Sequence, residues 1–288
     1  TAQSERMIST ASRAAPMTGH KLLETLLSRR YPAVMGVLNI TPDSFSDAGQ
    51  FLEPQHAFRQ ARRMIAQGAD IIDVGAESTR PYGSTAISAD EEMRRLKPVL
   101  PEIIALGVPV SIDSMKADVV DWALRIGAVI ANDVWGLQRD PDMARVVAAH
   151  HAPVVIMHNR ERADANIDIM QDIAAFFTRS LAIAEHAGIA RDNIILDPGI
   201  GFGKTHDQSM TVLARQHELS VFGLPLLIGA SRKRFIDTIT PSKPQERLGG
   251  SIAAHLLAVE GGARIVRAHD VAETVQALRV MAAIKDKR

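Results

Sequence analysis

The sequence predicts a (β/α)8 barrel, the TIM-barrel fold of the α/β class, as a single domain after a short N-terminal extension. Short apolar stretches alternate with amphipathic helical patterns eight times along the chain. Hydrogen-bonding or charged residues follow each apolar stretch. Eight strands that are each followed by a helix close into a barrel when the crossovers are right-handed. A doubly wound open sheet is the alternative, although it does not normally need eight near-uniform units.

The composition indicates a globular protein and excludes several classes of partner. Of the 288 residues, 46% are apolar, and 33 acidic residues balance 33 basic ones. A formal charge of zero argues against a nucleic-acid or membrane-surface partner. Cysteine is absent, which excludes disulfides and cysteine nucleophiles and fits a reducing compartment. Because no apolar run approaches the ~18 residues of a membrane span and no secretory signal pattern is present, we expect a cytoplasmic protein.

The N-terminal extension is predicted to cover residues 1–32, and the barrel residues 33–288. Residues 1–16 are small and polar, a composition typical of disorder. Residues 17–30 then show a short amphipathic helix pattern, which four leucines carry and which ends before Pro32. We expect this leading helix to plug the base of the barrel.

The predicted strands are short and apolar, as expected for strands buried on both faces. They cover residues 33–38, 71–75, 109–112, 128–131, 153–157, 193–196, 225–228 and 264–266. The predicted helices carry apolar stripes; in the first, Phe58, Ala61 and Met64 share one face. They cover residues 54–67, 89–105, 116–126, 141–150, 167–187, 208–219, 245–260 and 271–284. Glycines at 68, 107, 127, 188 and 262 follow helices where a left-handed cap is needed.

Polar residues gather at the ends of the strands, where a barrel of this type has its chemistry. One such residue alone is as readily a turn former or a helix cap, as Asp113 before Ser114 illustrates. A set from all eight strands predicts a deep polar pocket for a polar ligand. The set is Asn39, Glu77, Ser78, Thr79, Arg80, Asp113, Asn132, Asp133, His158, Asp197, Ser231, Lys233, Arg267 and His269.

The types of these residues indicate the type of ligand. Asp113 and Asp197, together with the amides of Asn39 and Asn132, form an acceptor-rich set that suits a flat heterocycle with N–H donors. Lys233 is placed to donate to a ring oxygen or nitrogen. The cations that follow the second and eighth strands suit a phosphate group, because a guanidinium is planar and forked. These cations are Arg80, Arg267 and His269.

The stretch GIGFGKT at residues 199–205 is similar to a phosphate-binding loop but fits neither common pattern. The first glycine of G-x-x-x-x-G-K-[ST] would fall at Pro198, and Lys204 stands where the last glycine of G-x-G-x-x-G belongs. We interpret the stretch as a loop whose glycines let the backbone approach the ligand.

Eight motifs occur in order between residues 34 and 271. They are LNITPDSFSDAG at 38–49, GADIIDVGAESTRP at 68–81, SIDS at 111–114, ANDV at 131–134, ILDPGIGFGK at 195–204, GASRK at 229–233, GGSIAA at 249–254 and RAHDV at 267–271. In this order and spacing the chain closely resembles the dihydropteroate synthase family of pterin-binding enzymes. No single motif is specific, but together they are.

The resemblance implies a transferase of folate biosynthesis that condenses 6-hydroxymethyl-7,8-dihydropterin pyrophosphate with para-aminobenzoate, with Mg2+, to give 7,8-dihydropteroate and pyrophosphate. It implies that Asp113, Asn132, Asp197 and Lys233 hold the pterin, and that Asn39, Arg267 and His269 hold the pyrophosphate, with Asn39 also near the metal. It places Phe45, Asp47, Thr79, Arg80 and Pro81 on two mobile loops that close over the site and shape the aminobenzoate pocket, near Ser231 and Arg234. The residues expected to be catalytic are Asp47, Arg80 and Lys233.

The chain departs from the family pattern at two places. Arg234 stands where the family usually has a small residue, and it either pairs with the aminobenzoate carboxylate or faces solvent. The segment after His158 lacks the glycine and proline that often follow this histidine. His158 is therefore either a site residue or a hydrogen-bonded residue at a strand end.

Two other functional classes remain to be weighed. A pterin-binding protein without synthase activity would need neither an intact first loop nor Arg80. A folate-dependent methyltransferase domain would lack the SRK and first-loop sequences. Because the loop sequences LNITPDSFSD and ESTRP are both intact here, we favour the enzyme. Because the family is dimeric, we expect a homodimer. One helix carries small residues at 249, 250, 253, 254 and 258, and this face either packs against a second subunit or covers the barrel. Since sulfonamides mimic para-aminobenzoate, we expect this protein to bind them.

Overall fold

Eight parallel strands form a closed barrel in the computed structural model, which describes residues 18–40, 54–78 and 86–288. The strands are β1 (Ala33–Asn39), β2 (Ile71–Gly75), β3 (Val110–Asp113), β4 (Ile130–Asp133), β5 (Val154–Met157), β6 (Ile194–Asp197), β7 (Leu227–Ile228) and β8 (Ile265–Ala268). Their order in the sheet is β6-β5-β4-β3-β2-β1-β8-β7. A parallel bridge between Leu196 and Leu226 joins the two ends of this order. The (β/α)8 barrel is therefore confirmed, and the doubly wound alternative is excluded.

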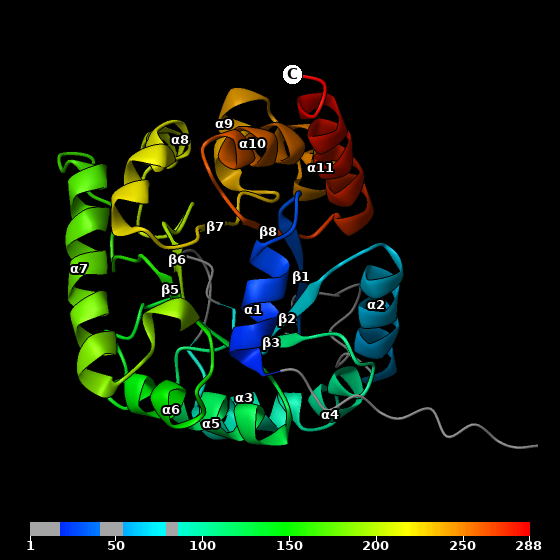
Figure 1. The fold of residues 1–288 in the computed structure, drawn as a ribbon, viewed down its shortest axis with the longest axis vertical. Coiled ribbons are helices and arrows are strands. Elements are labelled where there is room, and N and C mark those ends of the chain that lie inside the picture. The colour runs from blue at the N-terminus through cyan, green and yellow to red at the C-terminus, as the bar shows by residue number, and fades with distance from the viewer. Residues whose placement is uncertain (1–17, 41–53, 79–85) are drawn as a thin grey trace, which may run out of the picture.

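The helices form a ring outside the strands (Figure 1). They are α2 (Pro54–Ala66), α3 (Ala89–Leu96), α4 (Leu100–Ile104), α5 (Ala117–Ile126), α6 (Met143–Ala149), α7 (Ile169–Ala187), α8 (His206–Arg215), α9 (Arg234–Ile239), α10 (Leu248–Glu260) and α11 (Val271–Lys285). Their apolar faces bury a continuous core against the outer faces of the strands. No helix among the described residues has the length and apolar character needed to cross a membrane.

Several element boundaries differ from the sequence prediction for identifiable reasons. The helix predicted over 89–105 is two helices, α3 and α4, because Pro98 and Pro101 lack the N–H groups that a continuous helix needs. The strands β3, β4 and β6 extend into polar residues that were expected to follow them, since backbone pairing continues through those residues. The predicted cap glycines at 68, 107, 127, 188 and 262 all have positive φ, as expected.

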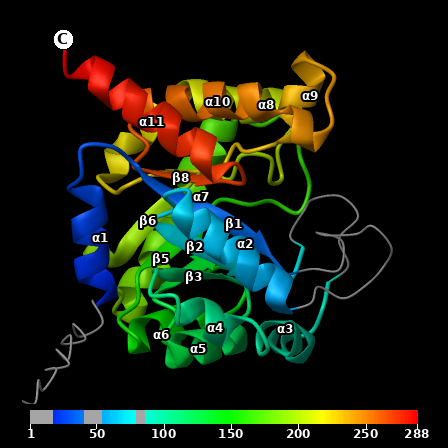
Figure 2. The ribbon, with the colours of Figure 1, turned by 90° about the vertical axis from the view of Figure 1, so that its right-hand side faces the viewer.

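The leading helix α1 (Gly19–Leu27) closes the amino end of the barrel, as expected. Its Leu22, Leu23 and Leu26 pack on an apolar layer to which seven strands contribute. Arg264, at the start of β8, donates from Nη2 to the carbonyl oxygens of Leu27 and Arg29 and so fixes the end of the helix. Figure 2 shows α1 and α9 at opposite ends of the barrel.

Strand alternation places a polar layer directly above this apolar one. Successive side chains of a strand point to opposite faces, so the residue two positions later lies on the same face, one layer higher. In this way Ile71, Ile130, Ile195 and Ile265 of the apolar layer are followed by Asp73, Asn132, Asp197 and Arg267. The sequence thus sets polar groups into the barrel interior at its carboxyl end.

Candidate active site

A salt-bridged cluster occupies the polar layer. Arg267 Nε lies 2.8 Å from Asp73 Oδ2, and its Nη2 lies 3.3 Å from Asp113 Oδ2. Asn132 Nδ2 donates to the same Asp73 oxygen at 3.1 Å. Strands β2, β3, β4 and β8 therefore meet through four side chains, three of which the sequence had singled out. The arrangement confirms that Asp113, Asn132 and Arg267 lie together.

Asp73 is the member of this cluster that sequence reasoning missed. It lies inside the apolar strand sequence IIDVG, and its side chain is fully buried. A lone carboxylate in a strand buried on both faces was the available signal, because such a charge needs a partner in the interior.

Several oxygens of the cluster are buried without a hydrogen-bond partner in the described part of the chain. Among the described residues, Asp73 Oδ1, Asp113 Oδ1 and Asn132 Oδ1 are buried and accept no hydrogen bond. Buried polar atoms are rarely left in this state, and each one is costly. Three acceptors without donors fit a ligand that brings several N–H groups.

Burial raises the pKa of two carboxyl groups in the polar layer, and only Asp113 is raised enough to be neutral at pH 7. Burial, and after it the charge of Asp73, raises the pKa of Asp113 to about 8. Burial also raises the pKa of Asp197 to about 6, although the backbone N–H of Gly199 and the charge of Arg267 act in the opposite direction. Donors from a ligand would stabilise the ionised forms.

Asp197 and Lys233 are linked through the glycine-containing loop between β6 and α8. Gly199 N donates to Asp197 Oδ1 at 2.8 Å. Lys233 precedes α9, and its Nζ lies 4.4 Å from the centre of the Phe202 ring, a cation–π distance. The loop therefore contacts two residues predicted for the pterin.

The remaining described site residues lie around the same mouth. Ser231 Oγ accepts from His269 N at 3.1 Å and lies 2.9 Å from His269 Nδ1. Asn39 is the last residue of β1 and is half-buried. Arg234 is exposed at the start of α9. Phe45, Asp47, Thr79, Arg80 and Pro81 lie outside the described residues, so their roles stay predictions.

Two of the polar strand-end residues have structural partners. Asp133 accepts from the backbone N–H groups of Trp135 and Leu137 at 2.9 and 2.8 Å, so it shapes the turn after β4. His158 is completely buried and hydrogen-bonded at the end of β5, where its backbone N–H donates to Asp197 O. This bears out the interpretation of His158 as a hydrogen-bonded residue at a strand end.

Glu77 takes part in a separate buried ion-pair cluster beside the mouth. Lys116 Nζ lies 2.5 Å from Glu77 Oε2 and 2.7 Å from Glu92 Oε2. Glu77 Oε1 also accepts from Ile87 N. Burial raises the pKa of Glu92 against the opposing effect of Lys116. Lys116 therefore neutralises two carboxylates that the fold has removed from water.

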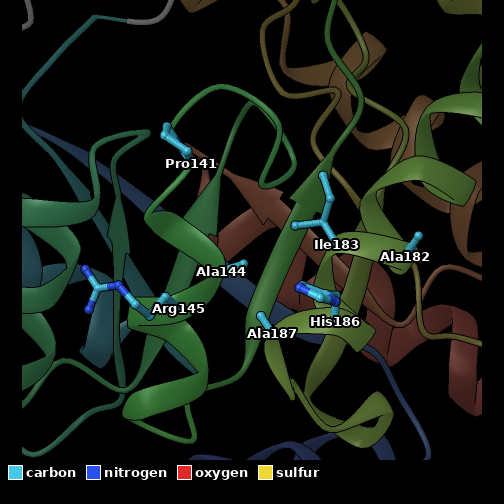
Figure 3. A pocket seen from close by; sticks show the side chains of 7 residues that line it. All are labelled: Pro141, Ala144, Arg145, Ala182, Ile183, His186 and Ala187. Atoms are coloured by element: carbon cyan, nitrogen blue, oxygen red, sulfur yellow. The ribbon is translucent and has the colours of Figure 1, made fainter.

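A hollow between α6 and α7 lies on the outside of the barrel, away from this site (Figure 3). Its lining is mostly apolar and consists of Pro141, Ala144, Arg145, Ala182, Ile183, His186 and Ala187. It lacks the converging polar groups of the barrel mouth, which remains the candidate active site.

Comparison with known proteins agrees with this assignment. Residues 35–269 match the family described as pterin binding enzyme. The dihydropteroate synthase of Bacillus subtilis is 46% identical over 88% of this chain and 89% of its own. The structure of the Xanthomonas albilineans dihydropteroate synthase with 4-aminobenzoic acid is similar, with 41% identity and a TM-score of 0.85 over 90% of this chain and 94% of that one. The structure of the Yersinia pestis dihydropteroate synthase with a sulfonamide drug is also similar, with 39% identity and a TM-score of 0.83 over 89% of this chain and 95% of that one. The chain therefore belongs to the dihydropteroate synthase family of pterin binding enzymes.

Proposed function

We propose that this chain is a dihydropteroate synthase, which joins 6-hydroxymethyl-7,8-dihydropterin pyrophosphate to para-aminobenzoate and releases 7,8-dihydropteroate and pyrophosphate. The observation that carries the proposal is the set of buried acceptor oxygens on Asp73, Asp113 and Asn132 that lack donors among the described residues. A pterin presents ring and amino N–H groups of the kind that this set requires.

The pterin is assigned to the polar layer of the barrel. Asp113, Asn132 and Asp197 accept its N–H groups, and Lys233 donates to a ring oxygen or nitrogen. Because hydrogen bonds to the ionised form lower a pKa, the pterin favours the carboxylate of Asp113 over the neutral group that the ligand-free pocket favours.

The pyrophosphate is assigned to Asn39, Arg267 and His269. In support, Arg267 is held in the polar layer by ion pairs with Asp73 and Asp113, which fix its charge at the carboxyl end of the barrel. Positioned positive charge stabilises a leaving anion because no reorganisation is needed during the reaction.

Mg2+ is the implied cofactor, and the side-chain oxygen of Asn39 is of the type that this ion prefers. Among the described residues no group of three or more His, Cys, Asp or Glu side chains could hold a metal ion. Mg2+ does not need such a cage, since it commonly binds one or two protein oxygens together with substrate phosphates and water. Asn39 would supply the protein oxygen, and the ion would neutralise charge on the departing pyrophosphate.

The reaction needs no protein nucleophile. The bond between the pterin methylene carbon and the pyrophosphate oxygen breaks, and the electron pair leaves with the pyrophosphate. The methylene carbon then carries positive charge, which Asp47 is assigned to stabilise, and the lone pair of the aniline nitrogen forms the new C–N bond before that nitrogen releases a proton. Phe45, Thr79, Arg80, Pro81, Ser231 and Arg234 are assigned to the aminobenzoate, and sulfonamides are expected to compete there.

We further propose a cytoplasmic homodimer, with an interface different from the small-residue face considered above. Ala254 and Ala258 of that face are buried and cover the barrel, whereas Gly249 and Ala253 are exposed. An apolar groove lies instead between α10 and α11, where Val280 and Ile284 are more than half exposed. Sedimentation of the wild type and of Ile284→Glu tests this assembly.

Pyrophosphate release tests the function directly. Purified protein is supplied with the pterin pyrophosphate and Mg2+, with and without para-aminobenzoate, for the wild type and for Asp47→Ala. We expect release that depends on the amine and falls by at least about tenfold in the variant, since the assigned charge stabilisation is worth more than ~1.4 kcal/mol. Pterin binding without turnover in the wild type would instead indicate a binding protein.

A further inference from the structure

A buried lysine outside the assigned substrate set lies against the glycine loop between β6 and α8. Lys204 is only 6% exposed. Its Nζ lies 2.7 Å from His158 Nδ1, 2.8 Å from the carbonyl oxygen of Gly199 and 3.0 Å from that of Phe202. Burial lowers the pKa of Lys204 to about 7. Its ammonium form has three N–H donors, and here each of them faces one acceptor.

His158 acts as an acceptor because its other ring nitrogen faces a carboxylate. Nε2 lies 2.8 Å from Asp172 Oδ2, and the second Asp172 oxygen accepts from Arg160 Nη1 at 2.7 Å. A proton on Nε2 leaves Nδ1 free to accept from Lys204. Burial, followed by the charge of Lys204, lowers the pKa of His158 to about 3, so the ring stays neutral at physiological pH. The four side chains form one chain of hydrogen bonds from α7 to the loop.

The loop lies directly on the backbone that follows β5. Gly199 has φ +71°, and a Cβ there would lie 2.1 Å from the carbonyl oxygen of His158. Gly203 has φ +58°, and a Cβ there would lie 2.6 Å from the carbonyl oxygen of Arg160. The glycines thus permit the contact, and Lys204 supplies the hydrogen bonds that fix it.

The same loop orients two groups of the polar pocket. Gly199 N donates to Asp197 Oδ1, and the Phe202 ring lies under the Lys233 ammonium. The stem of Lys233 also packs on the loop, since a Cβ on Gly201 would lie 3.2 Å from Lys233 Cδ. A shift of this loop would therefore move both groups.

We propose that Lys204 is a positioning residue of the pterin site, which holds the carbonyl groups of Gly199 and Phe202 and thereby orients Asp197 and Lys233. The role rests on the proposed function only in naming the pterin as the ligand. An apolar side chain at this position would leave the imidazole nitrogen and two carbonyl oxygens without their donor, and the loop would rearrange to recover hydrogen bonds.

Lys204→Met tests the proposal, with Lys97→Met as a control because Lys97 is exposed at the end of α3. We expect the KM for the pterin substrate to rise about tenfold or more in Lys204→Met, because the three hydrogen bonds of this buried side chain are lost and the acceptors on His158 and Gly199 stay buried. The KM for para-aminobenzoate and both constants of Lys97→Met should stay within about twofold of wild type. Amide exchange over residues 199–203 should also accelerate. A folded Lys204→Met with unchanged pterin KM and unchanged loop exchange would overturn the proposal.

A second pair of variants decides the matter if Lys204→Met does not fold. His158→Asn keeps an oxygen acceptor close to the position of Nδ1, whereas His158→Leu removes it. We expect the leucine variant to show the higher pterin KM and the faster loop exchange; equal values in the two folded variants would refute the role of Lys204. If the wild type shows no amine-dependent turnover, the proposed function fails, while the loop exchange still tests Lys204.

Discussion

Replacing Asp73 by asparagine removes one buried charge from the polar layer and leaves its shape nearly unchanged. Asp73 Oδ2 accepts from Arg267 Nε at 2.8 Å and from Asn132 Nδ2 at 3.1 Å, and its side chain is fully buried. A hydrogen bond to a charged group contributes about 1.5–3 kcal/mol, against about 0.5–1.5 kcal/mol between neutral groups. Loss of the charge at both bonds is therefore expected to lower the free energy of unfolding by ~2–3 kcal/mol.

The size of this loss should depend on pH through Asp113. The Asp73 charge is one cause of the raised pKa of Asp113, which is about 8. At pH 6 Asp113 is protonated and no repulsion is relieved by the substitution, so the full loss appears. At pH 9 Asp113 is ionised in the wild type, and removal of its repulsion with the Asp73 charge offsets part of the loss. Asp73→Asn should therefore destabilise the protein more at pH 6 than at pH 9.

Urea denaturation at the two pH values measures both effects. Asp192→Asn serves as the control, because Asp192 is an exposed carboxylate in the turn before β6 and its loss should change stability by no more than about 0.5 kcal/mol. The reasoning is wrong if Asp73→Asn lies within about 0.5 kcal/mol of wild type at pH 6, or if its loss is larger at pH 9.

Two further variants test the buried charges around the mouth. Lys116→Met leaves the buried carboxylate of Glu92 unpaired and should lower the free energy of unfolding by about 3–5 kcal/mol. Urea denaturation measures this loss, with Lys97→Met as the control, and a loss below about 1 kcal/mol would contradict the reasoning. Asp113→Asn tests the raised pKa: the folded wild type keeps this proton up to about pH 8 and the unfolded chain loses it near pH 4, so wild-type stability falls between these values by up to about 1.4 kcal/mol per pH unit. Asp113→Asn lacks this pH-dependent loss of stability. Its free energy of unfolding relative to wild type should therefore rise from pH 4 to 8 and then level off. A difference between the two proteins that stays constant over this range would rule out the raised pKa of Asp113.

The fold followed from the sequence because its signals are local and repeated. Apolar strands and helical stripes recur in every unit, and five glycine caps mark helix ends, so errors in single boundaries did not change the architecture. The boundaries that failed depended on specific chemistry. Two prolines divide α3 from α4, and α9 was not predicted because RFIDTI holds two isoleucines and a phenylalanine, whose local preference is for strand.

The sequence predicted the site residues that end a strand. It did not predict those whose hydrogen-bond or ion-pair partner comes from a distant part of the chain. Asp113, Asn132 and Asp197 were found because each closes an apolar run. Asp73 was missed because its partner Arg267 lies 194 residues away, and no local pattern relates them. Lys204 was considered only as part of a phosphate-loop motif; its partner His158 is 46 residues distant and becomes a neighbour through the pairing of β5 with β6.

The leucines of α1 close the amino end of the barrel, so the polar layer is approached from the carboxyl end of the strands. Every molecule that enters through the mouth must leave by the same route. Asp113, Asn132 and Asp197, which are assigned to the pterin, lie on the strands, whereas Ser231 lies on the loop after β7, nearer the rim. A small amine that occupied the rim first would block the larger heterocycle. Substrate binding is therefore expected to be ordered, with the pterin pyrophosphate binding first. This order would follow from the architecture of the barrel rather than from the relative affinities of the two substrates.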